Sequence, residues 1–245
     1  MDFYLIVAAF FVIAVIYSSV GFGGGSSYLA LLAVAAIDYQ LIRPTALFCN
    51  IIVVTGGTII FFRAGQLNVK KFWPFVAASI PAAFLGGYYP IKERVFFIVL
   101  GCTLIVAALL LWWKVKSNET VGKSGNLGLN LLLGSGIGFL SGLVSIGGGI
   151  FLAPVLHLIK WDSAKKIAAL ASFFILVNSI SGLAGQFTQG AIFNWSFTWP
   201  LLLAVFAGGQ IGSRLGANVF NPTYIKRITA VLILAAGINI LRNNI

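Results

Sequence analysis

The chain is built from long apolar runs separated by short polar connections. The ten apolar runs are residues 3–20, 26–37, 44–62, 72–90, 95–113, 127–144, 150–159, 166–186, 196–213 and 224–241. A helix needs about 20 apolar residues to cross the hydrocarbon core of a bilayer, and the third to fifth and eighth to tenth runs are long enough. The second and seventh runs are shorter, which favours re-entrant segments over full spans. The pattern predicts an all-α polytopic membrane protein.

The composition supports this class and excludes others. Of the 245 residues, 60% are hydrophobic and only 9% are charged, whereas a soluble domain has about 25% charged residues. A soluble enzyme and a disordered protein are therefore excluded. The sequence has no zinc-protease or nucleophile-elbow motif and no Cys/His cluster, and its five acidic residues are scattered. We expect neither enzymatic activity nor a metal or other cofactor.

The two halves of the chain resemble each other. Gly23-Gly24-Gly25 matches Gly147-Gly148-Gly149 at an offset of 124 residues, and Asp38 matches Asp162 at the same offset. Further pairs follow in the same order, including Asn50 and Asn178 at an offset of 128. A polar stretch at 114–126 separates the halves. The matches predict a first repeat over 1–113, a linker over 114–126 and a second repeat over 127–245.

The distribution of basic residues predicts the topology. Twelve of the 16 Lys and Arg residues fall in the connections 63–71, 114–126, 160–166 and 214–227. The other four are Arg43, Lys92, Arg94 and Arg242. Because basic residues collect in cytoplasmic loops, the first set is assigned to the cytoplasm and both termini to the outside. We read the net charge of +11 as this topology signal rather than as a sign of nucleic-acid binding.

This topology makes the halves inverted relative to each other. Each half then contains one glycine-broken helix pair and three full transmembrane helices. Inverted repeats of this kind are typical of secondary transporters. The assignment leaves open whether each broken pair is a re-entrant hairpin or two short spans, because both give the same number of net crossings.

The two glycine triplets predict breaks in helices. Each Gly costs a helix interior about 1 kcal/mol relative to Ala, and a broken backbone inside a membrane must be satisfied by protein or by a watery cavity. The short helix after each break would present free N–H groups and the positive end of its dipole. We therefore expect a midplane anion site formed by Gly23, Gly24, Gly25, Gly147, Gly148 and Gly149. No basic residue is present in 3–37 or 127–159 to contribute to it.

Close helix packing is the alternative role for glycine, since small residues let backbones approach. It is the favoured role for two stripes with four-residue spacing. These are Gly134, Gly138 and Gly142 in one apolar run and Gly208, Gly212 and Gly216 in another.

The paired glycine motifs and the short central linker resemble the TauE/SafE family of sulfite exporters, over essentially the whole chain. The family pattern has a Pro five residues after the last Gly; Pro154 matches it, and Ala30 departs from it in the first half. The resemblance implies a bacterial inner-membrane transporter of small sulfur-containing anions, such as sulfite or organosulfonates.

Uncharged polar residues near the breaks complete the predicted site. Asn50 and Asn178 lie inside apolar runs and could donate to an anion, although interhelical hydrogen bonding is the alternative. Ser18, Ser19, Ser26 and Ser145 flank the glycines and could also donate. We expect Gln66 and Gln186 at loop edges, His157 at the membrane interface, and Asp38 and Asp162 as caps or loop charges.

The sequence thus favours an exporter that works by alternating access around the midplane site, embedded in the bilayer and binding a small anion. An anion channel and a non-transporting membrane scaffold remain alternatives. The identity of the anion, the direction of transport and a homodimeric state stay open.

Overall fold

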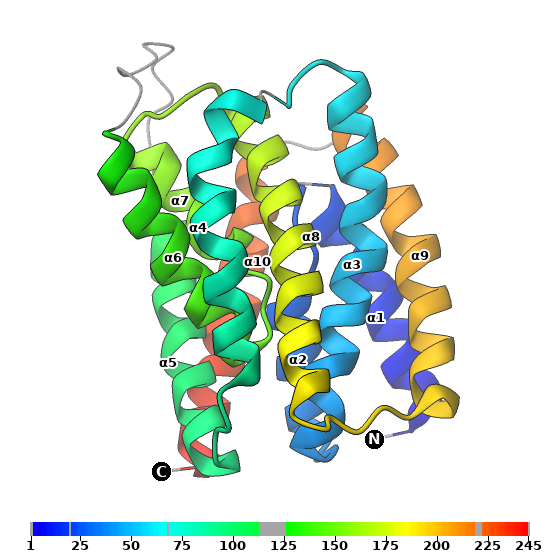
Figure 1. Cartoon of the computed structure of the whole chain (residues 1–245). Coiled ribbons are helices and arrows are strands. Elements are labelled where there is room, and N and C mark those ends of the chain that lie inside the picture. The colour runs from blue at the N-terminus through cyan, green and yellow to red at the C-terminus, as the bar shows by residue number, and fades with distance from the viewer. Residues whose placement is uncertain (1, 20, 68, 113–125, 219–221, 245) are drawn as a thin grey trace.

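The computed structural model describes residues 2–19, 21–67, 69–112, 126–218 and 222–244. Within them the chain forms helices and no strand (Figure 1). The helices are α1 (Phe3–Ser18), α2 (Gly25–Val34), α3 (Tyr39–Arg63), α4 (Val69–Tyr88), α5 (Glu93–Trp112), α6 (Leu127–Val144), α7 (Gly149–Leu158), α8 (Ala164–Thr188), α9 (Trp195–Asn218) and α10 (Pro222–Asn244). Each apolar run of the sequence therefore forms one helix, which confirms the all-α prediction.

Four helices in the described residues are long and apolar enough to cross a membrane: α3, α5, α6 and α8. The sequence predicted α4, α9 and α10 as full spans too. They have the length, at 20, 24 and 23 residues. Conversely, α6 qualifies as a span, although the sequence placed it in a broken pair. The shorter apolar helices are α1, α2 and α7.

Both glycine triplets interrupt the helical backbone as predicted. Gly24 has a φ of 89°, and Gly147 and Gly148 have φ values of 86° and 82°. A side chain with a Cβ is strained in this left-handed region, whereas glycine is not. Ser145 also adopts it, with a φ of 60°, where α6 ends. The backbone therefore turns at two points where the surrounding residues are buried.

The glycine stripe of α6 packs against α4. Gly134 faces the backbone of Phe75, and Gly142 faces that of Ala83, so closely that an added Cβ would overlap it. Successive glycines of α6 meet successive turns of α4, so the two helices run in the same direction. Close packing, the role that the sequence favoured for this stripe, is confirmed.

The second stripe does the same on the other side of the bundle. Gly208 and Gly212 of α9 face the backbone of Phe11 and Val15 in α1. The surroundings of Gly216 lie outside the described residues. Other contacts between the halves pair α5 with α10, α3 with α8, α4 with α8 and α3 with α9. In Figure 1, α3 and α8 lie side by side in the middle of the bundle and run in opposite directions.

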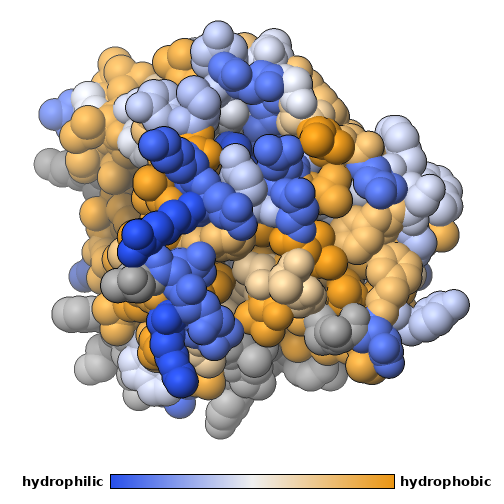
Figure 2. All heavy atoms as spheres, turned by 90° about the horizontal axis from the view of Figure 1, so that it is seen from below, coloured by the Kyte–Doolittle hydropathy of each residue, from blue (hydrophilic) through white to orange (hydrophobic). Residues whose placement is uncertain are grey.

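The bundle has two end faces. We call the lower one in Figure 1 the termini face, because both chain ends lie there, and the upper one the linker face. The connections after α3 and α7 lie on the linker face, and the connections after α2, α4 and α8 lie on the termini face (Figure 1). The predicted linker 114–126 lies outside the described residues except for Asn126. Figure 2 shows hydrophilic residues gathered across the termini face, with hydrophobic residues along much of its rim.

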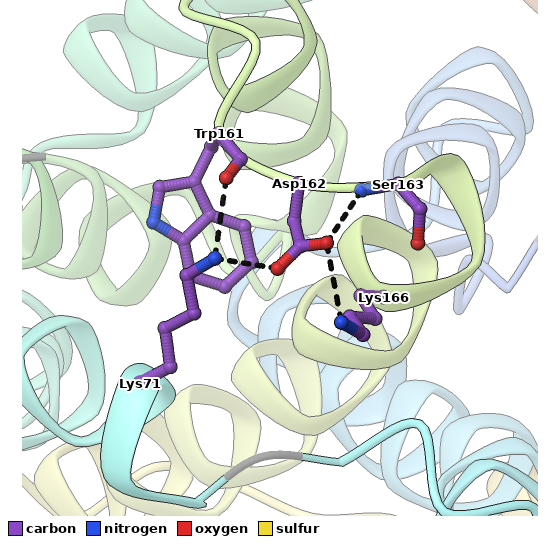
Figure 3. A network of polar contacts seen from close by, with 5 residues as sticks. All are labelled: Lys71, Trp161, Asp162, Ser163 and Lys166. Carbon is purple, nitrogen blue, oxygen red and sulfur yellow. Dashed lines mark hydrogen bonds and ion pairs between the residues drawn. The ribbon is translucent and has the colours of Figure 1, made fainter. Parts of the chain in front are cut away.

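An ion pair joins the two halves at the linker face. Lys71, at the start of α4, contacts Asp162 at 2.5 Å, and Lys166 lies 3.4 Å from the same carboxylate (Figure 3). Lys71 also donates to the carbonyl of Trp161 and lies 4.5 Å from the centre of its ring. The Asp162 side chain is only 4% exposed. Asp38, its sequence counterpart, is instead exposed and accepts from Gln40 N–H as the N-cap of α3.

The surroundings of Asp162 decide whether its contact stabilises the fold at higher or at lower pH. Burial opposes its ionisation, but the hydrogen bonds from Lys71 and Ser163 and the charges of Lys71 and Lys166 outweigh burial and lower its pKa. Because the native pKa lies below the unfolded value, the contact stabilises the fold above the unfolded pKa. That stabilisation is lost as pH falls through the native pKa.

We predict that Asp162→Asn lowers the free energy of unfolding at pH 7 by about 1.5–3 kcal/mol, the range for hydrogen bonds to charged groups. The difference from the wild type should shrink below about pH 3.9, the ordinary Asp pKa. Denaturant unfolding in detergent over a pH series measures both effects. Asp38→Asn is the control and should be neutral, because Asn also caps helices well. A loss for Asp162→Asn that is constant with pH would contradict the assignment.

Candidate functional site

The two glycine breaks meet at the side chain of Asn50. Asn50 lies in α3 and is fully buried. Its amide fills the space left by the missing side chains of Gly23 and Gly25, where any Cβ would overlap it. On its other side, Asn50 Nδ2 donates to the carbonyl of Ile146 at 3.0 Å, in the second break. One amide therefore spans the junction between the two breaks.

The second break faces a different kind of residue. Gly147 and Gly149 pack against Ile175 of α8, as Gly23 and Gly25 pack against Asn50 of α3. The spatial counterpart of Asn50 is thus Ile175, at an offset of 125. Asn178, which the sequence matched to Asn50, lies about one turn further along α8. The sequence match of Asn50 with Asn178 was wrong at this position, because the offset here is 125, close to the 124 of the glycine triplets, and not 128.

Buried polar atoms without partners collect on the helices around this junction. Asn178 is fully buried, and neither atom of its amide has a hydrogen-bond partner among the described residues. The same holds for Asn50 Oδ1 and for the hydroxyls of Ser141 and Ser179, which are also fully buried. Gly147 lies close to this cluster, since an added Cβ would be 3.0 Å from both Ser179 Oγ and Asn50 Nδ2. Buried polar groups are normally hydrogen-bonded, so this cluster can accept a polar ligand or water.

Two short helices begin at the junction. In α2, Ser27 and Tyr28 N–H donate to the carbonyl of Gly24, and in α7, Phe151 and Leu152 N–H donate to that of Gly148. The N–H groups of the first residues of a helix have no carbonyl acceptor within that helix. Both N-termini carry positive dipole character, and both lie in buried backbone.

The serines of the first break have protein partners. Tyr17 OH lies 2.6 Å from Ser27 Oγ and 3.4 Å from Ser26 Oγ. Ser18 and Ser19 donate to carbonyls of the preceding turn of α1. Of the predicted serines, Ser145 lies in the second break and receives a hydrogen bond of 2.8 Å from Gln186 Nε2.

A pocket of about 180 Å³ opens on the termini face; we call it the Arg43 pocket. Its lining comes from the start of α3, the connection after α4 and the end of α8, and includes Tyr39, Gln40, Arg43, Gln186 and Gln189. Gln186 is 2% exposed, so it is a buried residue of α8 rather than the loop-edge residue that we expected. Through its hydrogen bond to Ser145, Gln186 separates the pocket from the second break.

A second pocket of about 390 Å³ lies between the linker-face ends of α3 and α8; we call it the His157 pocket. Ser18, Ser19, Gly21 and Phe22 of the first break line it, together with Ala168 of α8. The predicted residues Ser18 and Ser19 thus belong to this pocket. Those at the junction, from Gly23 to Ser26 and from Ser145 to Gly149 with Asn50 and Asn178, line neither pocket.

Sequence reasoning missed four polar residues here: Arg43, Ser141, Ser179 and Gln186. A helical-face argument could have found two of them. Arg43 precedes Asn50 by seven residues and Gln186 follows Ser179 by seven, which places each pair on one face two turns apart. In the part of the chain that the structure describes, no group of three or more His, Cys, Asp or Glu residues could hold a metal ion. The expected lack of a cofactor remains a prediction.

Comparison with known proteins agrees with this architecture. The chain matches the family description "Sulfite exporter TauE/SafE" over residues 5–240. "Probable membrane transporter protein y4hK" of Sinorhizobium fredii is 36% identical over 238 residues, covering 95% of this chain and 96% of the relative. "Probable membrane transporter protein YunE" of Bacillus subtilis is 23% identical over 262 residues, covering 96% of each. No solved structure matches.

These names describe membrane transporters rather than enzymes. Together with the four long apolar helices, they make this chain a multi-pass membrane protein.

We predict opposite stability effects for the two buried asparagines. Asn178→Leu should raise the melting temperature in detergent, because it replaces two unpaired polar atoms by an apolar side chain of similar volume. Asn50→Ala should lower it, because it removes the hydrogen bond to Ile146 and leaves a gap between the breaks. Each effect should be about 1–3 kcal/mol. Equal losses in the two variants would contradict the assignment of Asn178 as an unsatisfied group.

Proposed function

The chain belongs to the TauE/SafE sulfite exporter family, and on this premise we propose that it is a secondary transporter of small sulfur-containing anions. The observation that carries the proposal is the cluster of unpaired buried polar atoms around the meeting point of the two helix breaks. Keeping polar groups unsatisfied inside a membrane protein is costly. A bound anion that accepts hydrogen bonds from the unpaired donors, Asn178 Nδ2 and the hydroxyls of Ser141 and Ser179, offsets the cost of those donors.

The scaffold we propose consists of two inverted repeats, residues 1–113 and 127–245, joined by the linker 114–126. The packing of the helices supports it. In these repeats α1 to α5 correspond to α6 to α10, in order. When each helix is replaced by its counterpart, the α4–α6 contact becomes the α9–α1 contact, and the α3–α8 and α5–α10 contacts map onto themselves. The opposite directions of α3 and α8 in Figure 1 agree with inversion.

In the site we propose, the anion is bound by the helix N-termini and by amides. Its oxygens accept hydrogen bonds from N–H groups at the starts of α2 and α7, in Gly23–Ser26 and Gly147–Gly149. Asn178 Nδ2, the second Nδ2 hydrogen of Asn50, and the hydroxyls of Ser141 and Ser179 contribute further donors. Sulfite, the anion in the family description, and organosulfonates, which we propose beside it, present three oxygens on one sulfur and suit such a ring of donors.

Alternating access follows from the two pockets in this proposal. The Arg43 pocket approaches the second break from the termini face, and the His157 pocket approaches the first break from the linker face. Rocking of one repeat against the other would open each pocket to the junction in turn. The Lys71–Asp162 pair, which joins the halves at the linker face, would part when that side opens.

We propose export, with the linker face in the cytoplasm of a bacterial inner membrane and both termini outside. The orientation is supported by the 12 basic residues in the connections 63–71, 114–126, 160–166 and 214–227. When an anion leaves a negative-inside cell, its free energy falls by about 2.3 kcal/mol per charge per 100 mV. The membrane potential would therefore drive export without a titrating residue.

Flux measurements in liposomes test this function. We predict that the purified chain exchanges radiolabelled sulfite across the bilayer with saturation, and that unlabelled sulfite on the far side accelerates uptake. A negative-inside potential should speed net efflux. An efflux rate that does not change with the imposed potential would contradict the driving force. A flux without saturation or counterflow would identify an anion channel instead.

Matched variants connect the flux to the junction. Asn178→Leu, which should fold, is expected to reduce exchange at least tenfold. Asn130→Leu is the control, because Asn130 is also buried with an unpaired Oδ1 but lies near the other end of α6, away from the break. If no variant or wild-type protein carried flux, the chain would be a non-transporting scaffold.

A further inference from the structure

The Arg43 pocket contains a basic side chain that the proposed function does not use. Arg43 lies in the second turn of α3, within a helix long and apolar enough to cross the membrane. It is the only charged residue in the lining of its pocket, which has no Asp or Glu. In the described part of the chain, both recorded ion pairs belong to Asp162, and Arg43 takes part in neither.

The contacts of Arg43 leave most of its hydrogen-bonding capacity unused. Its Nη2 donates to the carbonyl of Leu143 at 3.4 Å, a long bond to a neutral group. Its Cζ lies 5.5 Å from the centre of the Phe96 ring. Its Nε is buried without a partner. A guanidinium has five N–H donors, so Arg43 has donors available for an oxyanion in its pocket.

We propose that the Arg43 pocket is a separate binding subsite for a small oxyanion on the termini face, with Arg43 as its charged ligand. This rests on the proposed function, because the subsite serves the same substrate. The planar guanidinium binds two oxygens of one anion at once, which a lysine does not do. The pocket volume of about 180 Å³ admits sulfite or a short sulfonate.

The surroundings of Arg43 connect this subsite to the junction. Leu143, which accepts from Arg43, is the residue before the last of α6, directly ahead of the second break. Gln186 lines the pocket and donates to Ser145 within that break, and its Oε1 is buried without a partner. An anion on Arg43 is thus one side chain away from the break, and turning Gln186 away would let it pass.

The subsite has no equivalent arginine in the other half. At the repeat offset of 125, Arg43 corresponds to Ala168, which lines the His157 pocket. The two sides of the transporter therefore bind the anion with different strength, and the difference originates in one side chain.

Equilibrium binding tests the subsite independently of transport. The purified full chain in detergent is titrated with potassium sulfite and with methanesulfonate by calorimetry. Arg43→Gln is expected to weaken the Kd at least tenfold, which corresponds to ~1.4 kcal/mol. The Kd of Arg43→Lys should lie between those of the wild type and Arg43→Gln, because lysine keeps the charge but not the planar guanidinium. Arg94→Gln, an exposed arginine on the same face, is the control and should bind as the wild type does.

The outcomes separate this inference from the proposed function. Wild-type Kd values in Arg43→Gln would overturn the subsite and leave the transporter intact. Binding that depends on Arg43, in a protein that carries no flux, would support the subsite and overturn the transporter. Melting temperatures without anion show whether each variant folds. Should Arg43→Gln fail to fold, a wild-type affinity in Arg43→Lys would overturn the two-oxygen contact.

Discussion

Everything in this bundle depends on one constraint: polar backbone inside a membrane must find partners within the protein. The helical backbone is interrupted at two buried positions, Gly23–Gly25 and Ser145–Gly149, where the regular N–H to C=O pattern of a helix stops. At the second break, Asn50 Nδ2 donates a hydrogen bond to the carbonyl of Ile146. Side-chain atoms around the junction, including both amide atoms of Asn178, have no partner among the described residues, and in the proposed function an anion pairs with the donors among them.

The packing around the junction follows from the same constraint. Short helices such as α2 and α7 do not cross a membrane by themselves, so the long helices must hold them in place. Glycine stripes let α6 approach α4 and α9 approach α1 at backbone distance, which fixes the frame around the breaks. In the described residues both ion pairs lie at the linker face, where Asp162 contacts Lys71 and Lys166. The two halves are thus packed at backbone distance where α6 meets α4 and α9 meets α1, and the ion pairs of the described residues lie at one end of the bundle.

The helices and the two breaks could be predicted from the sequence, because apolar runs and glycine triplets determine them locally. The limits of the helices could not, since α3 begins at Tyr39, before its apolar run at 44–62. The packing role of Gly134–Gly142 could be predicted from four-residue spacing. The identity of the side chain facing the second break could not, since it depends on how α8 is rotated about its axis. An offset of 125 leads from Asn50 to Ile175, but matching identical residues led to Asn178 instead. Arg43 was counted as a loop charge because it lies next to the start of its apolar run, although its helix begins at Tyr39.

The central claim is that an anion binds where the two breaks meet. Selenite has the shape and charge of sulfite, and its selenium scatters anomalously, so a crystal structure with selenite tests the claim most directly. The account predicts an anomalous peak between the starts of α2 and α7, within hydrogen-bonding reach of the Asn50 or Asn178 amide. Selenium peaks confined to places outside this junction, in crystals of protein saturated with selenite, would contradict it.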